Sequence, residues 1–127
     1  MPSYPLLPCS AILFRAIAYS NFFKQGKPTW QIFKRRVKDI DGLSLGITPE
    51  GAVADFTKPH FGLLSVHVGR VRDVKDELDV VQDGDEHAII TGLPYSYDEN
   101  GNEDIYQKAA AQDLAKKLLE VARPYEP

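Results

Sequence analysis

The chain of 127 residues is 43% hydrophobic and 26% charged, the composition of a globular protein rather than of a disordered or coiled-coil chain. Such a chain buries roughly two thirds of the surface that its extended form exposes, which suffices for one hydrophobic core, so we expect a single domain over residues 1–127. With 18 acidic and 15 basic residues the formal charge is −3, which excludes the broad positive field on which nucleic-acid binding depends.

We expect no targeting signal at the N-terminus. Met1 to Pro8 contains no Lys or Arg, and the apolar residues that follow are interrupted by Arg15. The single cysteine, Cys9, cannot form an internal disulfide. These features predict a cytoplasmic protein without a membrane span, in which the thiol is reduced and buried or half-buried.

The first predicted strand covers Ala11 to Ile17 and contains a charge. Arg15 falls on the same face as Leu13 and Ile17, because alternate residues of a strand share a face. A charge inside a buried strand must be paired or neutralised. Arg15 therefore has no simple structural explanation and is the first candidate for a functional residue.

The next segment is predicted to be extended and partly basic. Asn21 to Thr29 contains Gly26 and Pro28 and is typical of a connection, whereas Trp30 to Val37 is rich in aromatic and branched residues and favours an extended conformation. The basic residues here are Lys34, Arg35, Arg36 and Lys38. Such a run is more often the solvated side of a structural element than a phosphate-binding patch.

A strand and a short helix follow. Leu43, Leu45 and Ile47 alternate with smaller residues, as in a half-buried strand. Thr48 and the following proline and Glu50 predict a helix start, with a capping hydroxyl and a carboxylate near the positive end of the helix dipole. The helix must end by residues 58–59, where a proline follows.

Three further strands are predicted in the centre of the chain. Alternating apolar residues favour a strand from Leu63 to Val71, with an irregularity at Gly69. Leu78 to Gln82 and His87 to Gly92 are separated by the turn-forming sequence Asp-Gly-Asp and predict a hairpin.

The C-terminal part is predicted to be a turn and a long helix. The Asn100-Gly101 pair marks the turn, and Asp104 is a candidate helix cap. The helix is indicated by apolar residues at helical spacing, namely Ala110, Leu114, Leu118 and Val121. The element order predicts an α+β fold: a mostly antiparallel sheet of about five or six short strands, with a short helix and a long C-terminal helix packed on it.

Metal binding is not indicated by the sequence. The nitrogen and sulfur candidates His60, His67, His87 and Cys9 do not form close pairs at ligand spacing. The chain also lacks a glycine-rich phosphate loop and a serine in a nucleophile-elbow pattern. We therefore expect no metal and no bound cofactor.

The remaining candidates come from successive elements. As catalytic residues we predict Arg15, Ser44, Glu50 and Asp55, and as ligand-binding residues Ser65 and His67. An arginine can bind a phosphate or carboxylate in a bidentate manner, a hydroxyl can orient a ribose, and a carboxylate can stabilise positive charge developing at a sugar carbon. Apart from the arginine, each of these residues is also explained by a solvent-facing strand position or by a helix start.

Several segments of the sequence carry a resemblance to known families. These segments are FRAI, FKRR, DGLSLGITPEGAVADF, LLSVHVGRVRDV and HAIITGLP. Together they resemble a family of small uncharacterised bacterial proteins with a GLS(V/L) core and a later His-Ala segment before a glycine. The likeness spans roughly Leu13 to Pro94 and implies a fold but no activity.

The chain also resembles, more distantly, RES-domain proteins, which are NAD-consuming toxins with an ADP-ribosyltransferase-like fold. The resemblance implies that Arg15 is the first-strand arginine and that Gly42 to Phe56 is the strand and helix that follow. The aromatic residue used by such sites is replaced in the region Leu43 to Leu45, and the family's helix glutamate falls at Asp55, which is one methylene shorter. NAD is then the implied substrate.

Three hypotheses about function follow. The first is an enzyme or toxin-like domain that acts on NAD or another nucleotide. The second is a non-catalytic module, such as a toxin-antitoxin partner, that binds a protein through its acidic surface or through the loop from Tyr95 to Tyr97. The third is a small-molecule sensor in which the same pocket residues bind a ligand without turnover.

Overall fold

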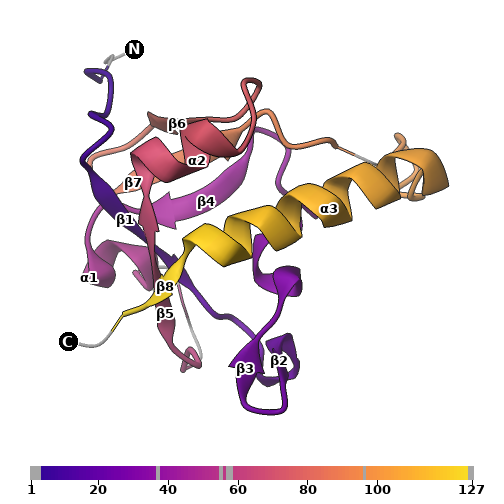
Figure 1. The fold of residues 1–127 in the computed structure, drawn as a ribbon, viewed down its shortest axis with the longest axis horizontal. Coiled ribbons are helices and arrows are strands. Elements are labelled where there is room, and N and C mark those ends of the chain that lie inside the picture. The colour runs from indigo at the N-terminus through magenta and orange to yellow at the C-terminus, as the bar shows by residue number, and fades with distance from the viewer. Residues whose placement is uncertain (1–3, 37, 55, 57–58, 96, 126–127) are drawn as a thin grey trace.

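One antiparallel sheet organises the chain, whose computed structural model describes residues 4–36, 38–54, 56, 59–95 and 97–125 (Figure 1). Its strands are β1 (Ile12–Ala16), β4 (Leu43–Gly46), β5 (Leu63–His67), β6 (Asp79–Gln82), β7 (His87–Thr91) and β8 (Arg123–Pro124). They are ordered β6-β7-β4-β1-β5-β8, and each neighbouring pair is antiparallel. A separate hairpin pairs β2 (Phe23–Lys24) with β3 (Lys27–Pro28).

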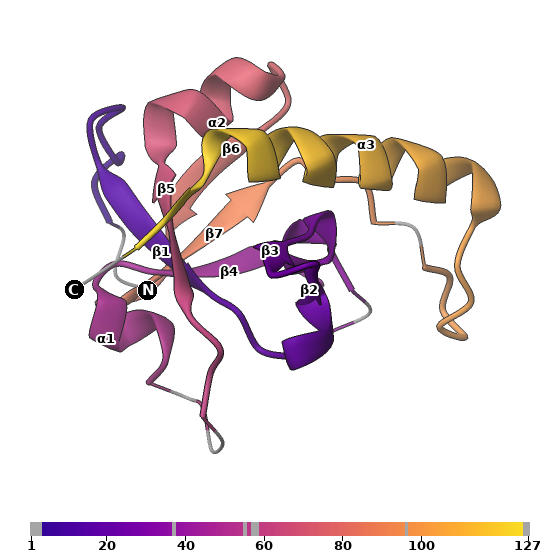
Figure 2. The same ribbon diagram turned by 60° about the horizontal axis from the view of Figure 1, so that its bottom comes forward.

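The helices lie on both faces of the sheet (Figure 2). They are α1 (Pro49–Ala52), α2 (Val68–Val74), α3 (Ile105–Val121) and the 3₁₀ helices η1 (Ser20–Phe22) and η2 (Trp30–Phe33). α2 and α3 cover one face, and α1 lies on the other. The expected α+β architecture, with a short helix and a long C-terminal helix, is confirmed. None of the helices in the described ranges is long and apolar enough to cross a membrane.

The residues of each strand divide between a core face and an outer face. In β1, Leu13 is opposite Val66 and Phe14 is opposite Ser65, so the register with β5 places Arg15 on the core face beside Leu64. The core face continues through β4 and β7, where Leu43 is paired with Ile90. The fully buried residues Leu43, Val66, Val80 and Ile90 come from this face. Burial of apolar area here, under α2 and α3, is the main stabilising contribution to the fold.

The short helix and the C-terminal helix begin as predicted. The Thr48 hydroxyl accepts a hydrogen bond from the Gly51 amide at 2.9 Å, and the Asp104 carboxylate accepts one from the Tyr106 amide at 2.8 Å. Both contacts satisfy amides that the helix itself leaves unpaired. α1 ends earlier than expected, at Ala52. The predicted hairpin of β6 and β7 is also confirmed.

The segment predicted to be extended, Trp30 to Val37, is instead helical at its start. η2 covers Trp30–Phe33, and Ile32 and Phe33 are fully buried beneath α3. A segment of four residues, three of them apolar, does not distinguish a strand from a helical turn by its periodicity. Packing against α3 decides the outcome here, because the segment lies under this helix and not at an edge of the sheet.

The basic residues after η2 are structural rather than solvated. Arg35 donates to the carbonyl oxygens of Asp39 and Leu93 at 2.7 Å, and also to that of Ile40. Arg36 donates to the Gln31 carbonyl at 3.1 Å. A further basic residue, Lys34, forms an ion pair of 3.4 Å with Glu103. The expectation of a solvated face therefore holds for the exposed Lys38 and was wrong for the other three.

The strand predicted from Leu63 to Val71 ends early and continues directly as α2. β5 stops at His67, and Val68 and Val71 are buried on the inner side of the helix. The helix start has no side-chain cap, and its Gly69 amide donates instead to the Cys9 carbonyl at 2.9 Å. This acceptor comes from a distant part of the chain, so no local pattern indicates where the helix begins.

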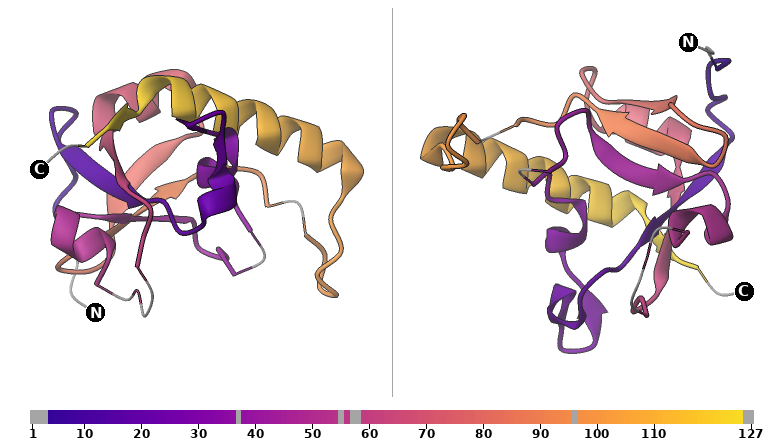
Figure 3. Two further views of the ribbon diagram at one scale, coloured as in Figure 1. Left: turned by 90° about the horizontal axis from the view of Figure 1, so that it is seen from below. Right: turned by 180° about the vertical axis from the view of Figure 1, so that it is seen from behind.

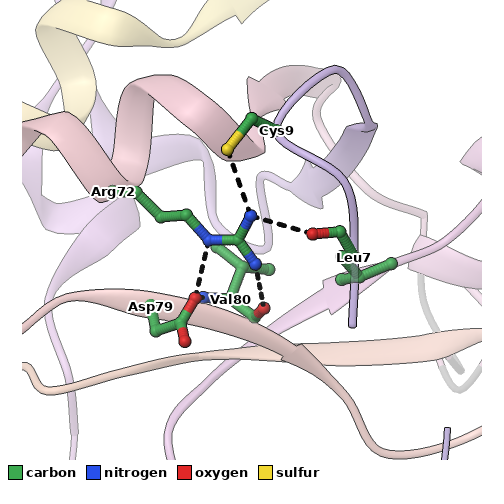
Figure 4. Close-up of polar contacts among 5 residues, drawn as sticks. All are labelled: Leu7, Cys9, Arg72, Asp79 and Val80. Carbon is green, nitrogen blue, oxygen red and sulfur yellow. Dashed lines mark hydrogen bonds and ion pairs between the residues drawn. The ribbon is translucent and has the colours of Figure 1, made fainter. Parts of the chain in front are cut away.

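An arginine network attaches the N-terminal segment to α2 and β6 (Figure 4). Arg72 Nε donates to Asp79 Oδ1 at 2.8 Å, and Nη1 donates to the Leu7 carbonyl at 2.8 Å. Nη1 also lies 3.4 Å from the Cys9 sulfur, and Nη2 lies 3.4 Å from the Val80 carbonyl. Cys9 is exposed, so the expectation of a buried or half-buried thiol was wrong. Its carbonyl and Cβ lie against Gly69 of α2, and its sulfur lies at the surface beside Arg72.

The arginine network predicts a stability contribution that depends on pH. The hydrogen bond from Arg72 lowers the pKa of the Asp79 carboxyl below its ordinary value. The contribution of the ionised pair is therefore present above about pH 4 and is lost as the pH falls through the lower pKa of the folded state. We expect Asp79→Asn to lower the free energy of unfolding by at most about 1 kcal/mol at neutral pH, because the side chain is partly exposed.

Urea unfolding of wild type and Asp79→Asn at neutral pH and below about pH 3 measures this effect. The matched control is Asp113→Asn, which removes a carboxylate from a more exposed ion pair with Lys117. If the free energy of unfolding of Asp79→Asn differed from that of wild type by the same amount at both pH values, the ion pair with Arg72 would not be the source of the stability.

Candidate functional site

A cleft opens where β1 and β4 separate. The two strands share one register pair, Phe14 with Gly46, whereas β1 and β5 are paired over five residues. β1 and β4 diverge beyond this pair, as the view from behind shows (Figure 3, right). Residues of both strands line the space between them, and it is closed by α1, by η1 with the residues before it, and by the segment before β4.

The cleft has a volume of about 460 Å³, which is within the range of small-molecule sites. Its lining residues come from β1 and the chain after it, from the segment before β4, from β4, from the region of α1, and from β7. They are Phe14, Arg15, Ala16, Ala18, Tyr19, Phe22, Lys38, Asp39, Ser44, Leu45, Gly46, Gly51, Ala52, Phe56, Pro59 and His87. Two of the predicted catalytic residues, Arg15 and Ser44, are thus brought together in one cavity.

Arg15 bridges the two diverging strands. Its Nε donates to the Ile32 carbonyl of η2 at 3.0 Å, and its Nη1 donates to the Ser44 carbonyl of β4 at 2.7 Å. Burial lowers the pKa of its guanidinium to about 10, while the nearby Asp39 carboxylate acts in the opposite direction. The group therefore remains charged at neutral pH. Arg15 has a structural role that the sequence did not reveal, because both acceptors are backbone atoms.

Aromatic rings also line the cleft. Tyr19 and Phe22 form an edge-to-face pair with centroids 5.2 Å apart, and the Arg36 guanidinium lies 5.1 Å from the Phe22 ring. Tyr19 and Phe56 are exposed, with 56% and 38% of their surface accessible. These rings present apolar faces to any molecule that enters the cleft.

Three charged or titratable residues of the cleft were not predicted from the sequence. Lys38 and Asp39 precede β4, and His87 begins β7. Asp39 accepts a hydrogen bond from the Arg36 amide at 2.9 Å, and His87 Nδ1 lies 2.5 Å from Asp83 Oδ1. The sequence around Lys38 and Asp39 indicates a turn, and the sequence around His87 indicates a strand end. Only the pairing of β4 with β7 brings His87 to the cleft.

The predicted carboxylates are not both part of this cavity. Glu50 is exposed in the first turn of α1 and does not line the cleft, which is consistent with its explanation as a helix-start residue. Asp55 lies outside the described residues. Asp39 is the carboxylate among the described lining residues, and its Oδ2 is already engaged by a backbone amide.

Ser65 and His67 line a different cavity. Both lie on the outer face of β5, and Phe14, which packs on Tyr125 with centroids 4.9 Å apart, is opposite Ser65 in the neighbouring strand. The Ser65 hydroxyl donates to the Arg123 carbonyl at 3.2 Å. The structure therefore does not bring these two predicted ligand-binding residues to Arg15.

The tyrosine loop of the interaction hypothesis is only half-exposed. Tyr95 and Tyr97 pack edge to face with centroids 5.6 Å apart, and the Arg35 guanidinium lies 4.8 Å from the Tyr95 ring. More exposed apolar side chains are those of Ile105 and Tyr106, at the start of α3. This end of the helix extends beyond the sheet (Figure 3, left).

Comparisons with protein-family models, with curated protein sequences and with solved structures find no match for this chain. Within the described ranges, no three His, Cys, Asp or Glu side chains are grouped in a way that could hold a metal ion.

The bridging role of Arg15 predicts a loss of stability when its donors are removed. Arg15→Met retains much of the aliphatic stem but leaves the Ile32 and Ser44 carbonyl oxygens without this donor. We expect the free energy of unfolding to fall by about 2 kcal/mol, and by less in Arg15→Lys, whose ammonium retains a charge-assisted hydrogen bond. Urea unfolding followed by the fluorescence of Trp30 measures the change. Equal stability of wild type and Arg15→Met would show that the bridge is not structural.

Gly46 predicts a second, steric effect at the cleft. A β-carbon at this position would lie 2.2 Å from the Ala52 nitrogen, so α1 packs against β4 only because the residue is glycine. We expect Gly46→Ala to cost about 1 to 3 kcal/mol through displacement of α1. The control is Gly84→Ala in the β6–β7 turn, where the nearest atom would be a His87 side-chain carbon at 3.3 Å. Thermal unfolding of both variants tests the prediction, which fails if the two are equally stable.

Proposed function

We propose that this chain binds NAD or a related nucleotide in the cleft between β1 and β4. The observation that carries the proposal is the composition of the cleft. About 460 Å³ of space is lined by a bridging guanidinium, a lysine, a serine and four aromatic rings. A nucleotide combines an anionic phosphate, a hydroxyl-rich ribose and a flat base, and each part has a complementary group here.

The phosphate is expected at the cationic side of the cleft. Arg15 uses two of its five N–H donors for the backbone carbonyls of Ile32 and Ser44, which leaves three for a ligand. Lys38 is exposed at the same cavity and can add a second positive charge. The half-buried position of Arg15 strengthens such contacts, because water screens them less than at an open surface.

The base is expected at the aromatic rings of the cleft, and the ribose at Ser44 beside Arg15. Tyr19 and Phe56 offer exposed rings for stacking, which contributes about 1 to 3 kcal/mol per base in proteins that bind nucleotides by this means, and the buried Phe22 packs against Tyr19. The Ser44 side chain is exposed on the outer face of β4 and can orient a ribose hydroxyl.

The resemblance to RES-domain proteins supports the same site. Arg15 corresponds to the first-strand arginine, and the segment Gly42 to Phe56 contains β4 and α1, which contribute lining residues. Bond cleavage would need a carboxylate at the sugar, and the resemblance assigns this to Asp55. Binding is therefore the primary proposal, and cleavage of the nicotinamide–ribose bond is its extension. Tyr95 and Tyr97 are half-buried and do not favour the alternative in which a protein partner binds through these tyrosines.

Titration of the purified protein with NAD by isothermal calorimetry tests binding. We expect saturable binding that weakens about three- to tenfold in Lys38→Gln, through loss of a charged contact, and about tenfold in Tyr19→Leu, through loss of a stacking ring. Lys75→Gln is the matched control, because it removes one exposed positive charge at the end of α2, away from the cleft. Absence of saturable binding by wild type, or an equal effect of Lys38→Gln and Lys75→Gln, would contradict the site.

Nicotinamide release from NAD separates an enzyme from a sensor. Release by wild type that is lost in Asp55→Asn, with NAD binding retained, would establish catalysis and the role of this carboxylate. Binding without release would identify a nucleotide sensor that uses the same cleft.

A further inference from the structure

A second cavity of about 170 Å³ lies between β1, β5, the start of α2 and the end of α3. Its lining residues are Ile12, Ser65, His67, Arg70, Val121 and Arg123, and none of them belongs to the nucleotide cleft. The volume is well below that of a typical site for a drug-sized ligand, so the cavity suits an ion or a single functional group. None of the described lining residues carries a carboxylate.

Two arginines give this cavity a positive charge. Arg70 is exposed, and no hydrogen bond or ion pair joins it to the rest of the described chain. Arg123 Nη1 donates to the carbonyl oxygens of Glu120 and Ala122, both at 2.8 Å. These contacts satisfy the negative end of α3, and the Nε and Nη2 donors of Arg123 remain for a ligand.

His67 supplies a third donor with a defined tautomer. Its Nδ1 is buried and has no hydrogen-bond partner among the described residues, so a proton at this position would lack an acceptor. The proton of the neutral ring is therefore better placed on Nε2, from which it can be donated to a ligand in the cavity that His67 lines. Ser65 has a positioning role, because its hydroxyl bond to the Arg123 carbonyl holds β8 beside β5.

We propose that this cavity is a binding site for a tetrahedral oxyanion, either inorganic phosphate or the terminal phosphoryl group of a monoester. Two guanidinium groups from different helix ends and an imidazole N–H converge on a space of the right size, and the acceptor oxygens of a phosphate satisfy several donors at once. The site is independent of the nucleotide cleft and does not rest on the function proposed for it.

Titration of ¹⁵N-labelled protein with inorganic phosphate at constant ionic strength, followed by ¹H–¹⁵N NMR, tests the site. We expect saturable shifts of the Ser65, His67 and Arg70 amides, and binding at least roughly tenfold weaker in Arg70→Gln and in Arg123→Gln. Lys116→Gln is the matched control, since it removes one exposed positive charge from the same part of α3 without touching the cavity. We expect this variant to bind as wild type does.

A second titration with methyl phosphate distinguishes the two sources of the anion. Binding of the monoester as tight as that of phosphate identifies a terminal phosphoryl group as the ligand, and weaker binding of the monoester identifies the inorganic ion. Shifts that rise linearly without saturation for both probes would overturn the proposal. So would an affinity for phosphate that falls equally in Arg70→Gln and in Lys116→Gln.

Discussion

The contact between Arg15 and two backbone carbonyls is the constraint on which the site depends. A guanidinium on the core face of a strand is costly to desolvate, and the carbonyls of Ile32 and Ser44 offset this cost without a carboxylate. The same contact bridges β1 and β4 where their pairing stops. The two strands therefore stay apart beyond their shared pair. The cleft between them results from the hydrogen bonds that the Arg15 guanidinium donates to the two carbonyls.

Small residues of β4 and α1 complete the cleft. Gly46 allows α1 to approach β4, and Gly51 and Ala52 place no large side chain where α1 lines the cleft. Larger side chains at these positions would fill the space that Arg15 opens. Further charged and aromatic groups come from the segments around the sheet, among them Tyr19 and Lys38. The sheet and α1 thus supply the shape of the site together with Arg15 and Ser44, and the surrounding segments add further groups that can contact a ligand.

Sequence patterns predicted the elements whose signals are local. The caps Thr48 and Asp104 and the β6–β7 hairpin depend on neighbouring residues, and so does the α+β class that follows from their order. Elements decided by distant partners were missed. η2 is helical because α3 covers it, and α2 begins where the backbone of Cys9 accepts its amide.

The same distinction applies to the candidate site. Arg15 was identified because a charge in an apolar strand has no local explanation, and Ser44 because a hydroxyl can orient a ribose, although its alternation with buried residues also explains it. Lys38 and His87 occupy unremarkable turn and strand-end positions, and only the packed chain shows that they reach the cleft. The start of α2 has a consequence for folding. Since its first amides depend on the segment before β1, this helix cannot be completed until the two ends of a long loop have met, so its formation belongs to a late, non-local step of folding.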